Sequence, residues 1–216
     1  MMGIGFGMPE DQSDEAELSR RAASGDSAAM AALFSRYRTK LKVMVRLRLD
    51  RRLQGRVDPS DILQETYLDA SQRMAQYANQ PGLPFFLWLR FLTAQRMLIT
   101  YRQHLGTKMR DANVEVSMFR GGMKAVATSI AEELLAGLSS PDQAAIRHEQ
   151  RLQLQDALNR MDETDREVLV LRHFEELSNH QVAQVLELSK TAASNRYVRA
   201  LKRLREILRD IGIGQL

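Results

Sequence analysis

The stretch of sequence that decides the fold is SNHQVAQVLELSKTAASNR, residues 178–196. Ser178 is followed three residues later by Gln181, a capping-box spacing that predicts a helix from Asn179 to Leu186. Ser189 then predicts the N-cap of a second helix, which begins at the next residue. Two capped helices joined by a tight turn are typical of a helix-turn-helix, whose second helix lies in the DNA major groove. The pattern therefore predicts contact with DNA.

The second helix of this motif continues as a long amphipathic helix. Its apolar residues recur on one side at helical spacing and are Tyr197, Leu201, Leu204 and Leu208. Its Arg and Lys residues point largely the other way, so one face can pack on the domain while the other meets phosphates and base edges. The residues in position to contact DNA are Lys190, Ser194, Asn195, Arg196, Arg199 and Arg203. The alternative is an ordinary amphipathic helix with solvated arginines.

The composition is that of an ordinary globular protein. The chain has 216 residues, 44% of them hydrophobic and 27% charged, which is enough to bury a core in one large or two small domains. No apolar run approaches the roughly 20 residues of a membrane span, and the uncharged first nine residues do not form a signal peptide. Because there is no Cys, disulfides and thiolate zinc sites are excluded. We expect a cytoplasmic protein.

Charge is distributed unevenly along the chain. The net charge is only +4, but nine Arg or Lys residues and one acid lie between Arg36 and Arg56, and six basic residues and one acid lie between Arg196 and Arg209. Two basic clusters far apart in sequence suit a protein that lies along a polyanion. A solvated helix face is the alternative for each cluster.

Helical periodicity is found nearly throughout, and strand or hairpin signals are nearly absent. We therefore predict an all-α protein with two small helical domains joined by a flexible linker. The predicted boundaries are a flexible N-terminal tail at 1–14, a first domain at 15–110, a linker at 111–141 and a helix-turn-helix domain at 142–212. Gly121-Gly122 and Ser139-Ser140-Pro141 interrupt the linker. Within the second domain, Thr164 and Glu167 predict a capping box that opens the helix before the helix-turn-helix.

A helix of the first domain carries a stripe of outward residues. Asp58-Pro59 supplies an N-cap and a Pro at the first helical position. Asp61, Gln64, Glu65 and Leu68 then recur at helical spacing on the side opposite the apolar residues. The stripe is either solvated or a docking face for a partner helix, and spacing does not decide between the two.

An aromatic segment, Pro84-Phe85-Phe86-Leu87-Trp88, opens the next helix. We expect Phe86 and Trp88 to belong to the core. Polar and cationic residues flank the segment, including Tyr77, Asn79, Arg90, Gln95, Arg96 and Arg102. Aromatics interleaved with cations beside a Pro/Gly loop suit the capture of unstacked bases from single-stranded DNA.

The sequence contains no motif typical of catalysis. Its four His residues do not form a metal-binding spacing with nearby acids, and there is no Gly-rich phosphate loop or Gly-x-Ser-x-Gly. We interpret the acid pairs Asp162-Glu163 and Glu175-Glu176 as exposed charges at helix ends. We therefore expect a non-enzymatic protein without cofactor or metal.

The order of these motifs resembles a bacterial RNA polymerase sigma factor of the sigma-70 family, of the extracytoplasmic-function (ECF) type that retains only regions 2 and 4. The resemblance covers about residues 16–208. It rests on Ala23-Ser24-Gly25-Asp26-Ser27-Ala28, Leu33-Phe34-Ser35-Arg36-Tyr37, Asp61-Ile62-Leu63-Gln64-Glu65-Thr66-Tyr67-Leu68-Asp69-Ala70, Phe85-Phe86-Leu87-Trp88-Leu89 and the helix-turn-helix.

The resemblance implies a function and a set of contacts. Region 2 of the family docks on the clamp helices of the polymerase largest subunit and melts the −10 promoter element, while region 4 binds the −35 element and the flap of the second-largest subunit. By position, the stripe Asp61, Gln64, Glu65 and Leu68 is similar to the clamp-docking surface. Tyr77, Asn79, Arg90, Gln95, Arg96 and Arg102 would meet melted −10 DNA, and the basic face of the last helix would meet the −35 duplex. Core RNA polymerase, promoter DNA and an anti-sigma factor are the implied partners.

The chain departs from the family pattern at several positions. Gln95 and Ile99 replace the usual Asn and Asp, and Ala193 replaces a branched residue between the two helices of the motif. Glu187 stands in the turn where Gly is common, and a left-handed backbone there would cost about 1 kcal/mol. Two other functions remain open, namely a dimeric helix-turn-helix regulator and a sigma-like decoy that sequesters an anti-sigma factor.

Overall fold

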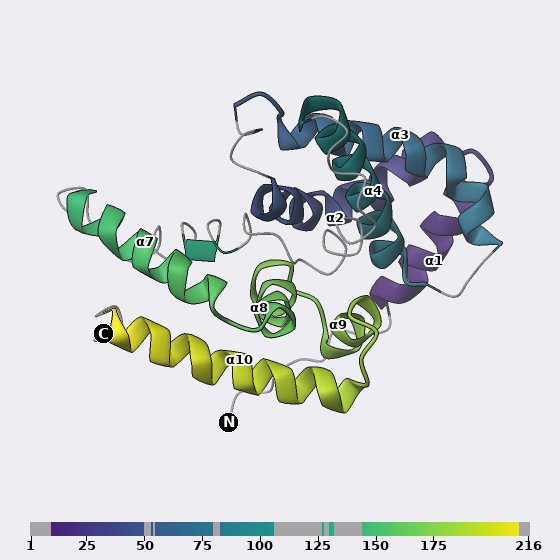
Figure 1. Cartoon of the computed structure of the whole chain (residues 1–216). Coiled ribbons are helices and arrows are strands. Elements are labelled where there is room, and N and C mark those ends of the chain that lie inside the picture. Colours follow the sequence, from purple (N-terminus) through teal and green to yellow (C-terminus); the bar gives the residue numbers. More distant parts are fainter. Residues whose placement is uncertain are drawn as a thin grey trace.

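The computed structural model describes residues 10–49, 53, 55–79, 83–105, 127, 130, 131 and 144–211, and this part of the chain contains helices and no strand. The N-terminal domain consists of α1 (Glu10–Ala23), α2 (Ser27–Arg48), α3 (Pro59–Ala78) and α4 (Phe85–Leu105). The C-terminal domain consists of α7 (Ala144–Asn159), α8 (Glu163–Leu169), the π-helical turn η3 (Val170–Phe174), α9 (Asn179–Val185) and α10 (Lys190–Asp210). The all-α, two-domain prediction is confirmed (Figure 1).

Side-chain caps fix the starts of the N-terminal helices. The Asp26 carboxylate accepts a hydrogen bond from the Ala29 amide at 3.0 Å and caps α2. Asp58 caps α3 in the same way through the Ser60 amide at 2.7 Å, and Pro59 occupies the first helical position as predicted. Gly25 lies in the turn between α1 and α2 at φ +96, a conformation that L side chains rarely adopt.

The start of α8 differs from the prediction. Its N-cap is Asp162, whose carboxylate accepts from the Asp165 amide at 3.0 Å, so the capping box predicted from Thr164 and Glu167 is wrong. Asp is among the best N-cap residues because its short side chain reaches the free amides of the first turn. Glu167 is instead fully buried and pairs with Arg48 of α2, so its carboxylate is not available for capping.

The two domains share buried apolar surface. One core cluster joins Leu33, Leu63 and Leu92 of the N-terminal domain to Leu171 and Val182 of the C-terminal domain. A second cluster is built mainly from α7, α8 and α10, and Leu47 at the end of α2 packs into it. In Figure 1, α8 lies between the N-terminal helices and the long helices α7 and α10. The domains are therefore in contact with each other, with η3 packed against α2.

Two of the predicted segments are described only in part. Helix α1 begins at Glu10, inside the segment 1–14 that was predicted as a tail. Most of the predicted linker, 111–141, lies outside the described residues, but Ala127, Ile130 and Ala131 are described and are buried against the second core cluster. Within the described residues, no helix is both long and apolar enough to cross a membrane.

Candidate nucleic-acid and partner interfaces

The helix-turn-helix is built as its caps predict. The Ser178 hydroxyl accepts from the Gln181 amide at 3.3 Å, and the Gln181 side chain accepts from the Ser178 amide at 2.9 Å, which completes the capping box. Ser189 caps α10 through the Ala192 amide at 3.1 Å. The Asn179 side chain also donates to the Lys190 carbonyl at 2.9 Å, so the starts of α9 and α10 are tied together.

The turn between α9 and α10 holds a strained residue. Glu187 has φ 53, in the left-handed region that favours glycine. The small side chains of Ala183 and Ala193 are buried between the two helices. The motif thus keeps its geometry with a smaller apolar plug than a branched residue would give, and with a non-glycine residue in its turn.

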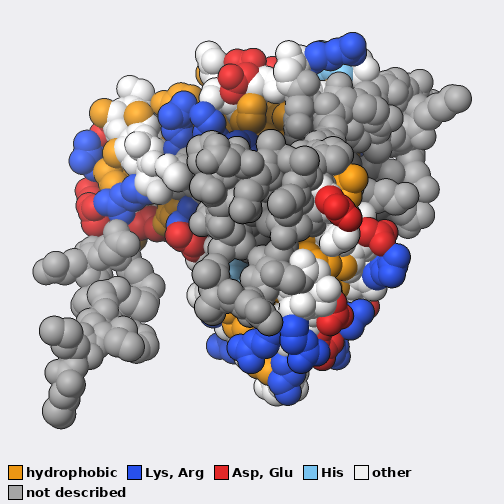
Figure 2. Space-filling model, turned by 90° about the vertical axis from the view of Figure 1, so that its left-hand side faces the viewer, with side chains coloured by type: hydrophobic (Ala, Val, Ile, Leu, Met, Phe, Trp, Pro, Cys, Tyr) orange, Lys and Arg blue, Asp and Glu red, His pale blue; other side chains and the backbone are white. Residues whose placement is uncertain are grey.

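The polar face of α10 is at the surface. Lys190, Ser194, Asn195, Arg199 and Arg203 are exposed, and Arg196 is partly exposed. The opposite face is centred on the buried residues Ala193, Ala200 and Ile207, with the predicted apolar stripe beside them. Figure 2 shows Lys and Arg side chains gathered at the lower edge of the molecule, at the level that α10 occupies in Figure 1.

Two arginines of this face are paired with acids at the start of α8. Arg199 donates to both Asp165 oxygens at 2.6 and 2.7 Å. Arg196 donates to Asp165 at 2.8 Å and to Asp162 at 3.0 Å. Although partial burial opposes the shift, hydrogen bonds from Arg199 and Arg196 hold the pKa of Asp165 below its usual range. The sequence motifs did not reveal this pairing, because the acids lie 31 and 34 residues before their partners.

The predicted stripe on α3 faces solvent along its whole length. Asp61, Gln64, Glu65 and Leu68 are all exposed, and Leu68 retains 53% of its surface. Ile62, Leu63, Thr66 and Ala70 on the other side are buried. The stripe therefore presents one apolar side chain among polar and acidic groups on a rigid helix.

An ion pair connects this helix to α4. Arg96 donates through two guanidinium nitrogens to both Asp69 oxygens, and its third nitrogen lies 3.5 Å from Glu65. Asp69 is buried, with only 9% of its surface exposed. Moving Arg96 to a phosphate would leave that carboxylate unpaired, so Arg96 braces α3 on α4 in this structure.

The aromatic segment forms a cluster at the start of α4. Tyr77 stacks on Trp88 with ring centroids 4.5 Å apart, and Phe85 packs against both rings. Phe86 is buried as predicted, whereas Trp88 is half-buried. The Tyr77 hydroxyl donates to the Leu83 carbonyl at 2.8 Å, and burial, with a smaller contribution from Glu15, raises the pKa of Tyr77 to about 12. Tyr77 is thus a neutral donor that holds the end of the loop.

The remaining residues predicted for single-stranded DNA divide into two groups. Asn79 and Arg102 are exposed and Gln95 is partly exposed. Arg90 lies elsewhere than expected, because only 2% of its side chain is exposed and its guanidinium points to Glu175 of the C-terminal domain at 2.8 Å. In this arrangement of the domains Arg90 has no path to a DNA strand.

Arg90 belongs to a buried network of four charges between the domains. Arg48 of α2 pairs with both Glu167 and Glu175, and Arg90 of α4 lies 2.8 Å from Glu175 and 3.5 Å from Glu167. All four side chains are at most 2% exposed. Two expectations are corrected here, since Glu175 is not an exposed helix-end charge and Arg48 of the first basic cluster does not face solvent.

The two buried carboxyls differ in their proton affinity. Burial raises the pKa of Glu167 to about 7, against the opposing effect of Arg48 and with the help of the neighbouring Glu175. For Glu175, burial acts in the same direction, but Arg48 and Arg90 together outweigh it and lower the pKa. Glu175 is therefore the carboxylate that stays ionised, and Glu167 is the one that can take up a proton.

Within the described residues, His, Asp and Glu side chains form no group of three or more that could hold a metal ion. Three exposed surfaces carry most of the predicted site residues: the basic face of α10, the outward stripe of α3 and the outer side of α4. A helix-turn-helix beside a second helical domain with an exposed stripe is typical of DNA-binding transcription proteins.

Comparison with known proteins narrows this class. The family described as sigma-70, region 4, matches residues 151–204, which include α8, α9 and most of α10. RNA polymerase sigma factor NccH of Alcaligenes xylosoxydans is 26% identical over 205 residues, covering 94% of this chain and 98% of NccH. RNA polymerase sigma-H factor of Pseudomonas aeruginosa is 24% identical, covering 93% and 96% of the two chains.

Two further similarities complete the comparison. ECF RNA polymerase sigma factor BldN of Streptomyces coelicolor is 26% identical, covering 94% of this chain and 70% of BldN. The solved structure of CnrH in complex with the cytosolic domain of CnrY superimposes with a TM-score of 0.55 at 22% identity, covering 91% of this chain and 98% of CnrH. That likeness concerns the fold. The match to sigma-70 region 4 and these relatives together support an RNA polymerase sigma factor of the sigma-70 family and of the ECF type.

Proposed function

We propose that this sigma factor directs core RNA polymerase to its promoters through three separate surfaces. The basic face of α10 binds the −35 duplex, the outward stripe of α3 docks on the polymerase clamp helices, and the outer side of α4 with its preceding loop holds melted −10 DNA. The observation that carries the proposal is that polar residues of all three surfaces are exposed in one chain. The protein acts through binding energy and has no catalytic step of its own.

The −35 assignment is supported by the helix-turn-helix geometry. The Ser189 cap places Lys190, Ser194 and Asn195 in the first turns of α10, where a recognition helix meets base edges. Arg199 and Arg203 lie further along the same exposed face and suit phosphates. Asp162 and Asp165 hold Arg196 and Arg199 in place, so these arginines exchange a carboxylate for a phosphate on binding.

The docking assignment is supported by the shape of the α3 stripe. An exposed Leu68 beside Gln64, Glu65 and Asp61 offers an apolar contact surrounded by polar groups, as at many protein interfaces. The ion pairs of Arg96 with Asp69 and Glu65 position this stripe relative to α4. The −10 surface then comprises Asn79, Gln95, Arg102 and the Tyr77–Trp88 stack, with Arg90 joining it only after the domains separate.

We also propose an anti-sigma protein as a partner. One solved chain that this fold resembles is CnrH in complex with the cytosolic domain of CnrY, so a fold of this kind accepts a second protein. A bound protein on the α3 stripe would compete directly with polymerase. Cytoplasmic location follows from this set of partners.

In vitro run-off transcription with core polymerase over a library of genomic promoters tests the proposal. We expect the wild-type chain to support initiation from a defined promoter set. Glu65→Lys, which reverses a charge in the docking stripe, should weaken core binding by about tenfold or more while duplex binding by α10 is retained. Equal loss of both activities would overturn the role of the stripe. Tight binding of a symmetric duplex by a dimer without polymerase would identify an ordinary regulator instead.

A further inference from the structure

The first basic cluster of the sequence is carried largely by α2, which has six Arg or Lys residues and no acid. Three of the six pair with acids of other elements, and these are Arg36, Lys40 and Arg48. The other three form no ion pair in the part of the chain that the structure describes. We call these three residues, Arg38, Lys42 and Arg46, the α2 basic row.

The α2 basic row lies along one side of the helix. Its members recur every four residues, so at about 100° and 1.5 Å per residue they occupy an arc of about 80° and extend over about 12 Å of the helix axis. Arg38 and Arg46 are exposed, and Lys42 is partly exposed. On the opposite side of α2, Leu33 and Met44 are fully buried. The row therefore points away from the core of the N-terminal domain.

Asp58, the N-cap of α3, interacts with the row only weakly. Hydrogen bonds from the Ser60 amide and hydroxyl are the main causes of the lowered pKa of Asp58, and the charge of Lys42 makes a smaller contribution. The Asp58 carboxylate is already bound to the first turn of α3. The row thus keeps its positive charge at the surface.

The face of α2 around the row has no large apolar side chain. The exposed residues beside the basic ones are Ala31, Ser35 and Thr39. Within the described residues, the large hydrophobic side chains that are exposed lie on α3, α4, α7, α10 and the loop before α4, and none lies on α2. Protein interfaces are centred on apolar or aromatic anchors, whereas the phosphate backbone of DNA is bound mainly through charge. This face therefore suits DNA better than an acidic protein.

The length of the row also fits a DNA strand. Each strand of B-form DNA carries one phosphate per about 3.4 Å of helix axis, so about three or four phosphates lie along about 12 Å. Three cations held on a straight helix can therefore neutralise about three phosphates of one strand. Contacts of this kind position a duplex without reading its sequence.

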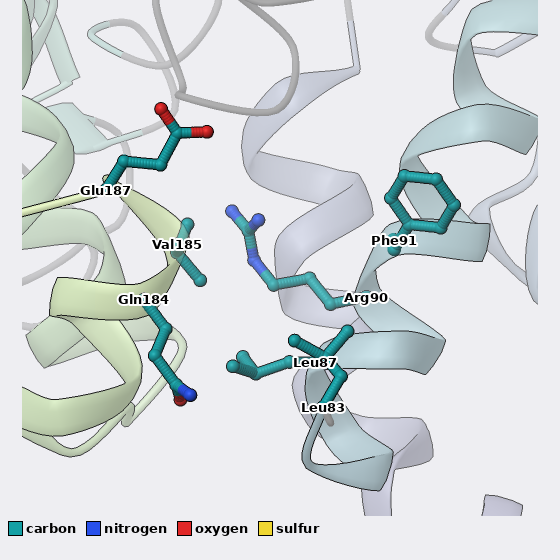
Figure 3. Close-up of a pocket in the computed structure, with 7 residues that line it drawn as sticks. All are labelled: Leu83, Leu87, Arg90, Phe91, Gln184, Val185 and Glu187. Carbon is teal, nitrogen blue, oxygen red and sulfur yellow. The ribbon is translucent and has the colours of Figure 1, made fainter. Parts of the chain in front are cut away.

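Two arginines expected to meet −10 DNA are bound to carboxylates instead. Arg90 pairs with Glu175 at 2.8 Å, and Arg96 pairs with Asp69. Figure 3 shows Arg90 extending from α4 toward α9, beside a pocket of about 320 Å³ between these two helices. The charge of Arg90 is therefore directed into the protein, whereas the α2 basic row directs its charge outward.

One end of the row lies near the start of α4. Arg38 follows Tyr37, whose ring centroid lies 6.1 Å from that of Phe85 and 5.2 Å from that of Phe86. Phe85 also packs against Trp88 in the aromatic cluster. The row therefore begins beside the cluster at which the proposed function places melted −10 DNA.

We propose that the α2 basic row is a second duplex-DNA-binding site of this protein, which binds phosphates independently of sequence. The binding itself rests on the charges and exposure of α2 alone. Its role in initiation rests on the proposed function: the row holds duplex DNA beside the melted −10 segment and so supports strand separation.

Fluorescence anisotropy of the full-length protein with a short labelled duplex of random sequence, at several salt concentrations, is the direct measurement. Arg38→Gln, Lys42→Gln and Arg46→Gln combined should weaken binding by about tenfold or more at low salt and lower the salt dependence by about two to three counterions. Binding by the basic face of α10 should remain. Lys42→Gln alone should lower the salt dependence by about one counterion, and it decides the question if the triple variant does not fold.

A charge-matched variant controls this measurement. Arg20→Gln, Arg73→Gln and Arg160→Gln combined remove the same charge from exposed positions on α1, on α3 and after α7. Because these positions are scattered, the salt dependence should stay almost unchanged. A poly-glutamate peptide tests an acidic protein as the partner, and it should bind the wild-type protein and the triple row variant equally weakly.

Run-off transcription with core polymerase tests the role in initiation. The triple row variant should initiate about tenfold less often than wild type from a fully duplex promoter, because fewer phosphates are held beside the −10 segment. Wild-type initiation by a variant whose duplex binding has fallen would contradict the role in strand separation.

Three binding results would overturn the site. They are an unchanged salt dependence in the folded row variants, an equal loss in the charge-matched variant, or tight binding of poly-glutamate that the row substitutions abolish. If duplex binding changes as expected but the wild-type chain initiates from no promoter, the proposed function falls and the site stands. If the salt dependence is unchanged while transcription proceeds, the site falls and the proposed function stands.

Discussion

Arginine–carboxylate pairs occur in this protein in two contrasting places. On α10, Arg196 and Arg199 retain 30% and 60% of their side-chain surface and share Asp165. In the buried network between the domains, the side chains of Arg48 and Arg90 retain 1% and 2% of their surface and share Glu167 and Glu175. The exposed pairs can exchange a carboxylate for a phosphate with little cost in hydration. The buried pairs cannot, so the same chemistry gives an exposed basic surface in one place and a structural contact in the other.

This contrast between buried and exposed ion pairs predicts that the largest effect of a substitution is on the free energy of unfolding. Glu175→Ala should lower the free energy of unfolding by about 3–5 kcal/mol, because removing one member of a buried network leaves uncompensated charge. Urea unfolding followed by circular dichroism measures this loss. Asp156→Asn, which breaks an exposed pair, should leave the midpoint almost unchanged. Equal effects of the two substitutions would remove the distinction between buried and exposed pairs.

The next largest expected effect is the dependence of folding stability on pH. Because the pKa of Glu167 is about 7 in the folded protein and near 4.5 when unfolded, the folded state binds more protons between these values. Stability should therefore fall by about 1–3 kcal/mol as pH rises from about 4.5 to about 7. The charged groups facing Glu167 are Arg48, Arg90 and Glu175. Below this window, protonation of Glu175 should destabilise the buried network between the domains, because the pKa of Glu175 is lowered in the folded protein.

Urea midpoints measured across this pH range test that prediction. Glu167→Gln is the matched variant, because it keeps the shape of the side chain and cannot titrate. Its stability should be nearly flat from about pH 5 to pH 7. A wild-type curve that rises with pH over the same window would contradict the raised pKa.

A smaller effect is expected on DNA binding. Asp165→Asn should raise the affinity of the C-terminal surface for duplex DNA by a few-fold, because an acid that competes with phosphate for Arg196 and Arg199 is removed. Arg199→Ala should lower that affinity and reduce the salt dependence by about one counterion. Fluorescence anisotropy at several salt concentrations measures both. If Asp165→Asn weakens binding, the acid positions the arginines more than it competes for them.

The smallest effect concerns the turn of the helix-turn-helix. Glu187→Gly should stabilise the protein by about 0.5–1 kcal/mol, since glycine adopts φ 53 without strain. Glu187→Ala keeps a Cβ in the same backbone conformation and should give no such gain. Thermal unfolding of the two variants compares them. A gain for both would attribute the effect to the carboxylate and not to the backbone.

Local features were predictable because they depend on residues a few positions apart. The capping box of Ser178 and Gln181, the caps at Asp58 and Ser189, and the outward stripe of α3 all follow from spacings within one or two helical turns. The prediction failed for the helix before the helix-turn-helix, where Asp162 and Thr164 both suit an N-cap. Glu167 does not take part in the expected capping box, because its side chain is buried and pairs with Arg48 instead.

The sequence by itself thus determined the helices, the helix-turn-helix and the family resemblance, including the exposed faces of α3 and α10. Only the tertiary structure decided the fate of the charged residues that meet between domains. Arg48 and Glu167 are 119 residues apart, and Arg90 and Glu175 are 85 apart. Charge and spacing along the chain do not tell whether an arginine faces water or a distant carboxylate, because burial depends on which helices pack together.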